Sequence, residues 1–440
     1  MRRPRPALHQ ARPSRWLVAT SAVFLLVLAG CSSSSSDSTA TLTATSTTIE
    51  SPTPTASPTS EATPATTPEP DLAAIEARIE ELRDLTPATD LRREFVDDEA
   101  LHTILDDELG DPAVRDSFLK EGRLLIALGL LPADTDVIEL YGALLDEQVL
   151  GLYDPATRAM YVRSGAPFDT LQEVTYAHEY AHALQDAHFD LQTLDAATPN
   201  RDASYALSAL VEGDATLWQT LYLQDLGLAA ALELLGTSLT APTPDVPSVL
   251  LDFLLFPYQE GLTFATAVNR AGGTSALDQA FESPPASTEQ VLHPEKYEAG
   301  EQPREVTTPF EALEARPVDY ADVLGELTLR LWLRRSGLST RVASAAAAGW
   351  GGDRFALLTN TEGPSDLVAV IEWDTEADAA EFEGALVEIP LEVGASVSVE
   401  FGGRAVALSR LDATTTVLAV AASEADAEGM LRTTATLVAP

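Results

Sequence analysis

The stretch TLQEVTYAHEYAHALQDAH, residues 170–188, carries three of the six histidines of this 440-residue chain. It contains no Gly or Pro and is rich in good helix formers, which predicts a helix. Thr170 and Glu173 have the spacing of a capping box, so we expect the helix to begin there. His178 and His182 are four residues apart and therefore lie on one face, one turn apart. Two imidazoles in that arrangement can bind one metal ion together.

The acidic residue inside this histidine pair has its own place on the helix. Glu179 follows His178 directly and lies about 100° round the helix, near the metal but not among its ligands. A carboxylate in that position is suited to act as a base on a water bound to the metal. The pattern resembles the HExxH motif of the zincin metallopeptidases. This resemblance implies a Zn²⁺ site, with Glu179 as the catalytic base.

A hairpin is expected just upstream of the HExxH helix. Residues 149–162, VLGLYDPATRAMYV, contain two apolar runs on either side of the turn sequence DPAT. In zincins a hairpin precedes the HExxH helix, and its edge strand pairs with an extended substrate. The resemblance therefore implies a peptide-binding strand above the metal.

The third metal ligand has two candidates, and the first is His188. Its spacing from His178 matches the outer spacing of HExxHxxGxxH, the signature of the metzincins. Those enzymes have a Gly that turns the chain back where this sequence has Gln185, a good helix former. They also carry a methionine turn under the metal, and none of the three methionines suits that role. We therefore expect His188 to be a residue at the helix end, or one that contacts a metal ligand, in preference to a ligand itself.

The second candidate is Glu212. A glutamate on a second helix after HExxH resembles the gluzincin arrangement, typified by thermolysin. The 30-residue interval from His182 to Glu212 leaves room for a loop and a returning helix. The resemblance implies that His178, His182 and Glu212 bind Zn²⁺, and we favour this set.

The helix that carries Glu212 is predicted over residues 202–227, with Asp202 as N-cap and Gly227 as the stop. Gly213 lowers helix stability at its centre, which indicates close packing or a close backbone approach there. Asp214 lies about 200° from Glu212 round the helix. It is expected either to orient a histidine ligand or to face solvent.

A peptidase site also needs a donor for the oxyanion of the tetrahedral intermediate, commonly Tyr or His in gluzincins. Tyr258 is one candidate, in FPYQEGLTFA. The others are His293 and Tyr297, in the polar, Pro-rich segment PPASTEQVLHPEKY. Segments like HExxHALQD, VEGDA and STEQ…HPEKY are similar to those of uncharacterised bacterial lipoproteins, over residues 75–355. That resemblance implies a peptidase-like protein and names no substrate.

The N-terminal segment indicates export and anchoring. Five arginines precede an apolar run that ends in LAGC, which is the pattern of a secretory signal over residues 1–30. LAGC resembles the lipobox of bacterial lipoproteins, and this resemblance implies lipidation of Cys31. Residues 31–70, beyond that cysteine, are dominated by Ser, Thr and Pro and predict a disordered tether. We therefore expect a lipid-anchored protein on the extracytoplasmic face of a bacterial cell membrane.

The charge of the chain excludes some partners. Without the five N-terminal arginines it holds 22 basic and 68 acidic residues, a net charge of −46. Such a surface is poorly suited to nucleic acid or anionic lipid. The membrane is expected to hold the protein through the lipid on Cys31 alone.

The C-terminal quarter changes pattern. Residues 318–348 look helical, and GWGGDR (349–354) resembles a turn. From about 354 onward strand and helix patterns alternate over about 90 residues without any His or Cys, which indicates a small α+β unit of ferredoxin-like type. It can bind a partner or brace the first domain.

The fold expected is therefore α+β. A mostly helical, zincin-like catalytic domain spans residues 71–348, with the hairpin before its HExxH helix, and a small α+β domain spans residues 349–440. The function expected is zinc-dependent peptide-bond hydrolysis, with a peptide or protein as substrate. The alternative is a non-catalytic zinc-containing binding lipoprotein on the same scaffold.

Overall fold

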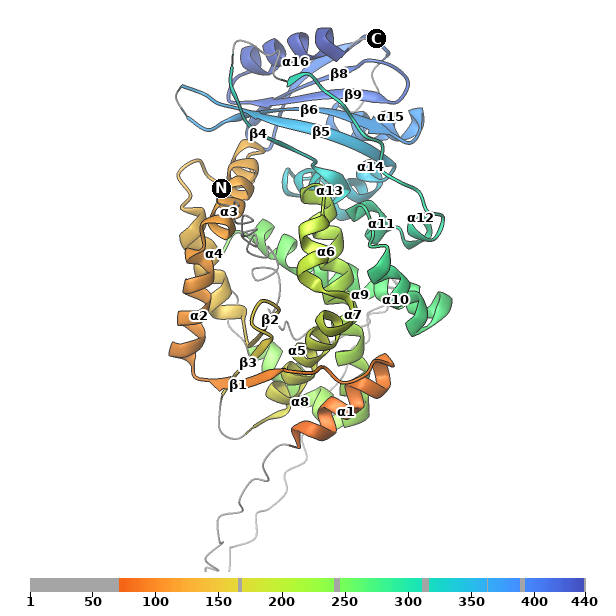
Figure 1. Ribbon diagram of the computed structural model, residues 1–440. Helices are drawn as coiled ribbons and strands as arrows, with labels where there is room; N and C mark the ends of the chain where they lie inside the picture. Colours follow the sequence, from red (N-terminus) through yellow and green to blue (C-terminus); the bar gives the residue numbers. More distant parts are fainter. Residues whose placement is uncertain are drawn as a thin grey trace, which may run out of the picture.

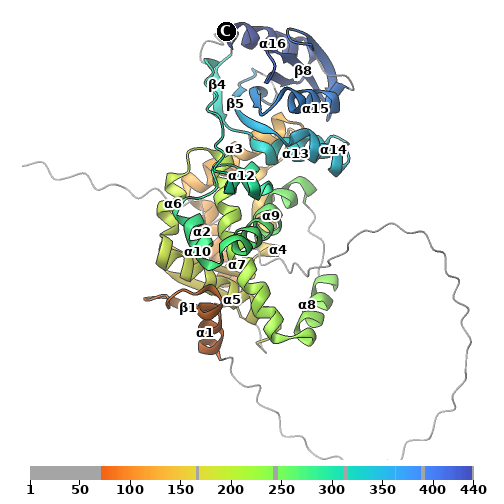
Figure 2. The same ribbon diagram turned by 90° about the vertical axis from the view of Figure 1, so that its right-hand side faces the viewer.

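The structure is a computed structural model, and it describes residues 71–164, 168–240, 246–310, 316–361, 363–387 and 392–438. The predicted signal segment, Cys31 and the tether lie outside these ranges. Within them the chain is mixed α+β, as expected from the sequence. A helical body lies below a six-stranded sheet in Figure 1, and Figure 2 shows the same two layers after a quarter turn.

The helical body carries the histidine pair. Its helices are α1 (Leu72–Arg83), α2 (Asp98–Gly110), α3 (Pro112–Ala127), α4 (Val137–Gln148), α5 (Thr170–Phe189), α6 (Leu191–Ala197), α7 (Arg201–Leu226), α8 (Leu228–Thr240), α9 (Ser248–Gly272), α10 (Thr274–Glu282), α11 (Thr288–Leu292) and α12 (Pro294–Glu298). α5, α7 and α9 contribute to one large apolar core, in which Tyr176, Leu210 and Phe264 are fully buried. None of the described helices is long and apolar enough to cross a membrane.

A small sheet flanks α5. Its strands are β1 (Arg92–Val96), β2 (Gly151–Asp154) and β3 (Ala159–Arg163), in the order β1-β3-β2. β2 and β3 pair antiparallel around the DPAT turn, so the predicted hairpin is confirmed. β1 pairs with β3 in parallel, which leaves β2 at the edge of the sheet.

The beginnings of two helices differ from the prediction. α5 is capped by Asp169, whose side chain accepts from the backbone of Gln172 while the Gln172 side chain accepts from Asp169 N–H. The capping box is therefore one residue earlier than expected, because Asp169 is itself a good N-cap. α7 begins at Arg201 with Asn200 as its cap, since Asp202 is buried and accepts hydrogen bonds from Thr288 instead. The predicted stop of α7 at Gly227 is confirmed.

α7 and α9 cross at two glycines. A Cβ on Gly213 would lie 2.1 Å from the carbonyl oxygen of Gly261, and a Cβ on Gly261 would lie 2.2 Å from that of Ala209. Only glycine permits such a close approach of two helix backbones. Gly213, beside Glu212, is therefore required for the close packing of α7 against α9, as its unfavourable position inside a helix predicted.

The upper layer is an antiparallel sheet of β4 (Val318–Asp322), β5 (Trp350–Leu358), β6 (Asp366–Trp373), β7 (Ser396–Phe401), β8 (Arg404–Arg410) and β9 (Thr415–Ala421), in the order β4-β5-β6-β9-β8-β7. α16 (Glu424–Val438) covers one face. The other face packs against α13 (Gly325–Arg335), α14 (Thr340–Ala347) and α15 (Glu376–Val387). Because both faces are covered, β9 is buried along its whole length (Figure 1).

Three expectations for this layer are wrong. A ferredoxin-like sandwich has a helix between its third and fourth strands and both helices on one face, whereas here β8 and β9 are joined directly and the helices cover opposite faces. Residues 318–322 form β4 rather than a helix, because they pair with β5. GWGGDR is no turn, since Trp350 onward is strand β5, with a register shift between Trp350 and Gly352.

Candidate metal centre

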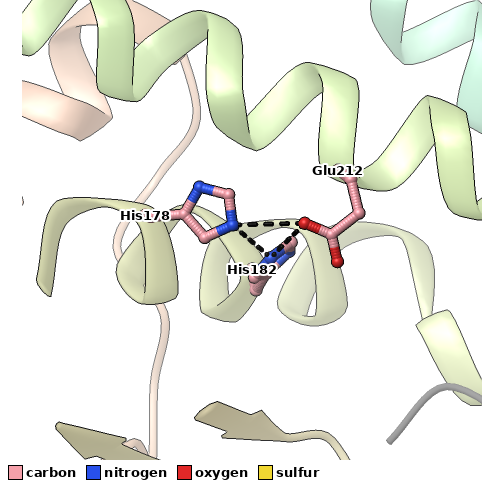
Figure 3. Close-up of side chains that lie close together, drawn as sticks. All are labelled: His178, His182 and Glu212. Carbon is pink, nitrogen blue, oxygen red and sulfur yellow. Dashed lines mark hydrogen bonds and ion pairs between the residues drawn. The ribbon is translucent and has the colours of Figure 1, made fainter. Parts of the chain in front are cut away.

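Three side chains from two helices converge inside the helical body (Figure 3). The Nε2 atoms of His178 and His182 lie 3.0 Å apart. Glu212 Oε2 lies 3.2 Å from Nε2 of His178 and 3.4 Å from Nε2 of His182. All three side chains are at most 1% exposed. The structure thus brings together the two histidines and the glutamate that the sequence singled out.

These residues fit a zinc ion. Ligand atoms at about 2.0–2.2 Å from zinc in a tetrahedron are about 3.3 Å from one another. The three distances in this cluster, 3.0, 3.2 and 3.4 Å, match that spacing. Two imidazole nitrogens and a carboxylate oxygen are also the ligand types that zinc prefers. The second oxygen of Glu212, Oε1, is buried and accepts no hydrogen bond from the described residues, so a cation could bind it.

The charges inside the cluster favour a positive charge beside Glu212. Burial lowers the pKa of His178, and the hydrogen bond to Glu212 offsets this only in part. Burial also acts to lower the pKa of His182, but the carboxylate of Glu212 outweighs it and raises the pKa to about 9. Burial likewise acts to raise the pKa of Glu212, but the two histidines lower it to about 2. Without metal, Glu212 is therefore an ionised carboxylate and His182 is protonated. A bound zinc ion would supply the positive charge in place of that proton.

A chain of buried polar groups supports His182 from behind. Its Nδ1 lies 2.9 Å from Oε1 of Gln185, and Gln185 Nε2 donates to Asp214 Oδ2 at 2.9 Å. Asp214 also accepts from Trp218 Nε1 at 2.9 Å and from Arg83 Nε at 3.1 Å. Such partners fix the tautomer and the ring orientation of a histidine ligand. Asp214 thus orients a histidine, one of the two roles considered for it, and it does so through Gln185.

Sequence reasoning missed the role of Gln185 itself. It was interpreted only as the helix former that argues against a metzincin site. The spacing of three residues from His182 places the two on one helix face, and that was the available signal.

α1 holds the histidine helix against α7. Tyr180 on α5 donates to Glu80 on α1 at 2.5 Å, and Arg83 at the end of α1 forms a second ion pair with Asp278 at 2.7 Å. Arg83 is 1% exposed, so its buried charge depends on the carboxylates of Asp214 and Asp278. The first described helix therefore supports the candidate metal centre.

Glu179 lies beneath the edge strand. It is fully buried, and a Cβ on Gly151 would lie 2.9 Å from its Cγ and 3.1 Å from its Oε1. The same Cβ would lie 2.8 Å from Cγ2 of Thr175. The beginning of β2 is thus pressed onto the HExxH helix at Glu179, and glycine is the residue that allows it. Gly151 is a site residue that the sequence did not single out.

The three predicted oxyanion donors lie in different places. The ring of Tyr258 stacks on His178, with centroids 6.2 Å apart and planes at 29°. His293 Nε2 lies 3.0 Å from Glu326 Oε2, and the hydroxyl of Tyr297 donates to the carbonyl of Ser283 at 3.0 Å. Neither His293 nor Tyr297 has a polar or ring contact with the cluster in the described part of the chain. Of the three, the structure places Tyr258 beside the candidate metal centre.

The alternative ligand, His188, points away from the cluster. It is exposed near the end of α5, and its Nε2 lies 3.0 Å from the carbonyl oxygen of Thr86. The helix continues through Gln185 without the turn that would bring His188 back.

A second acidic trio has a lysine at its centre. Carboxylate oxygens of Glu289, Glu301 and Asp374 lie within 4.8 Å of one another. Lys296 Nζ lies 2.7 Å from Glu289 and 3.0 Å from Glu301, and it also contacts Asp374. The ammonium group already occupies the centre of this cluster, which links α11 and α12 to the end of β6.

Comparison with known proteins covers only the upper layer. A protein-family profile described as Domain of unknown function (DUF8575) matches residues 316–431. This range runs from just before β4 into α16 and excludes His178, His182 and Glu212. A search of curated proteins and a search of solved structures find no match to this chain.

Proposed function

We propose that the protein is a zinc-dependent peptidase of gluzincin type. His178, His182 and Glu212 would hold the ion, and Glu179 would act as the catalytic base. The observation that carries the proposal is the convergence of the three ligand atoms, which lie within 3.4 Å of one another. Two of them belong to the helix that also carries Glu179.

The ion, when bound, would supply a Lewis acid for water and for the carbonyl group of the substrate. The chain's own residues would move the proton. Glu179 would accept it from the attacking water and return it to the leaving amine. Its burial beside the first residue of β2 favours this role, because bulk water is kept from the carboxylate.

The edge strand supports a peptide as substrate. Among the described strands β2 pairs only with β3, so its other edge can pair with an extended chain. A peptide bound there would pass close to Glu179, because β2 begins over that side chain. Tyr258, stacked on His178, is the candidate donor to the oxyanion.

The test combines metal analysis with an assay on a diverse peptide library. The full chain should bind one zinc and cleave peptides. Glu179→Gln should keep the zinc and the fold but lose about 10²–10⁴-fold in turnover, since an amide cannot accept the proton. Glu173→Gln is a matched control on the same helix. Glu173 accepts a hydrogen bond from the hydroxyl of Tyr222, so this variant should leave turnover unchanged.

A second pair of variants tests the ligand set. Glu212→Ala should lose zinc under stringent dialysis, whereas His188→Ala should retain it. The reverse result would contradict the gluzincin assignment. Zinc binding without cleavage of any peptide would favour the alternative, a non-catalytic zinc-containing binding protein.

A further inference from the structure

The helix face that presents Glu212 extends beyond the metal site. Arg201, Ser204, Tyr205 and Ser208 lie at helical spacings that place them in one stripe with Glu212. Ser208 is four residues, or about 6 Å along the axis, from Glu212. What this stripe faces therefore adjoins the proposed zinc site.

The stripe lines a cavity of about 180 Å³. α7 and α9 touch at Gly213 and Gly261, and the cavity lies beside the turns that lead up to this crossing on both helices. From α9 the lining includes Phe253 and Pro257, and Pro257 directly precedes the tyrosine that stacks on His178. Helices α3 and α4 close the far side. The cavity thus lies along the same two helices that carry Glu212 and Tyr258.

The walls contain five aromatic rings, those of Phe118, Tyr141, Tyr205, Phe253 and Tyr320. Phe118 and Tyr141 have ring centroids 4.2 Å apart, and those of Tyr205 and Phe253 are 5.5 Å apart. Such walls favour an apolar or aromatic group, which gains from burial and from ring contacts.

Arg201, the charged group on the stripe, is already paired. The wall also holds four other charged side chains, those of Lys120, Glu121, Asp195 and Asp322. Arg201 Nε and Nη2 each lie 2.5 Å from an oxygen of Glu121, and the guanidinium lies over Tyr205 at 4.8 Å from the ring centroid. Its Nη1 donates to Thr328 at 2.7 Å. Because these groups satisfy the guanidinium, it is not free to bind a carboxylate. The wall therefore favours a neutral group over an acidic one.

The size suits one side chain. An engineered apolar cavity of about 150 Å³ binds benzene, so 180 Å³ accommodates a phenyl or a leucyl group. The half-buried Lys120, Tyr141 and Leu254 leave the cavity accessible from solvent.

We propose that this cavity is a specificity pocket, which binds a large neutral apolar or aromatic side chain of the peptide next to the bond that is cleaved. The assignment of the bound group as part of a substrate rests on the proposed peptidase function. The pocket itself can be tested by binding alone.

The binding experiment uses the full chain with Glu179→Gln, so that the titrated compounds are not hydrolysed. N-acetyl-phenylalanine amide, N-acetyl-alanine amide and N-acetyl-aspartate amide are titrated and followed by ligand-observed NMR. The phenylalanine compound should bind at least tenfold more tightly than the other two. Ser208→Phe fills the pocket from α7, and Leu254→Trp fills it from the rim on α9. Both variants should reduce the ratio of the affinity for the phenylalanine compound to that for the alanine compound to about one. Leu232→Trp, at an exposed position on α8, should leave this ratio unchanged.

The second experiment measures kcat/KM of chains with Glu179 intact, for peptides that differ only in Phe or Ala beside the scissile bond. The preference for Phe should disappear in Ser208→Phe and Leu254→Trp, whereas Leu232→Trp, outside the pocket, should keep it. A preference that survives in both folded variants overturns the pocket and leaves the peptidase proposal standing. Selective binding of the phenylalanine amide without cleavage of any peptide supports the pocket and overturns the peptidase proposal. Tighter binding of the aspartate compound than of the phenylalanine compound overturns the pocket's chemistry.

Discussion

Gln185 offers the sharpest test of the proposed zinc site. Gln185→Leu keeps the volume of a fully buried side chain and removes its polar end. His182 Nδ1 loses its partner at 2.9 Å, and Asp214 loses one of three donors. Nothing in the ligand set changes, so any effect on zinc must come through the orientation of His182.

The expected magnitude follows from these contacts. A buried N–H left without an acceptor costs about 1–3 kcal/mol in stability. Loss of the group that orients a metal-binding histidine typically weakens the metal by about 10–100-fold. At about 1.4 kcal/mol per factor of ten, this is about 1.4–2.8 kcal/mol of zinc-binding free energy. The bond is lost with or without zinc, so the affinity change reports the tautomer and the ring orientation that Gln185 holds.

The assay is a zinc titration of the full chain in competition with a chromogenic chelator at constant pH. Trp218→Phe is the matched control. It removes a bond of 2.9 Å to the same Asp214 and leaves the contact between Gln185 and His182 intact. We expect the control to bind zinc within about twofold of the wild type, because it leaves that orienting contact unchanged.

Two results would refute this reasoning. One is unchanged zinc affinity in a folded Gln185→Leu protein, which would mean that packing alone orients His182. The other is an equal loss in Trp218→Phe, which would mean that general loosening of the core, rather than the partner of His182, weakens the site.

Three further predictions concern other parts of the chain. Burial raises the pKa of Asp202 to about 7, so the folded state keeps a proton that the unfolded state loses near pH 3.9. The stabilising contribution of this proton is present at low pH, and the free energy of unfolding falls by about 2–3 kcal/mol between pH 5 and 8. Asp202→Asn should remove this pH dependence from denaturant titrations. Gly213→Ala should lower the free energy of unfolding by about 1–3 kcal/mol or more, because its Cβ meets backbone of Gly261, whereas Gly236→Ala, whose Cβ meets nothing within 4 Å, should be neutral or stabilising in the same thermal melts. Cys31→Ser should move the protein out of the membrane fraction or block its processing, and unchanged partitioning with unchanged mass would contradict a lipid anchor.

Local patterns in the sequence were sufficient for several features. The period of the α-helix alone places His178 and His182 on one face, and the DPAT turn between apolar runs is enough to predict the hairpin. Gly227 ends its helix because a residue with positive φ is needed there. Each of these depends on interactions within a few residues.

Other features of the site depend on contacts between distant segments. Glu212 was one of two candidates for the third ligand, and only the antiparallel packing of α7 against α5 brings it to the histidines. Asp202 is a good N-cap by type, yet it is buried against Thr288, and the helix begins at Asn200. The carboxylate that supports His182 reaches it through Gln185, a residue whose helix propensity concealed its polar role.

The sequence by itself thus determined the residue types and the short-range geometry of the site, along with the α+β character of the chain. The tertiary structure decided which side chains meet, which glycines lie at helix and strand contacts, and that the upper sheet is covered by helices on both faces. The physical reason is that helix periodicity, turns and caps arise from neighbouring residues. Pairings such as Glu212 with His178, 34 residues apart, depend on how whole helices pack, which no local pattern encodes.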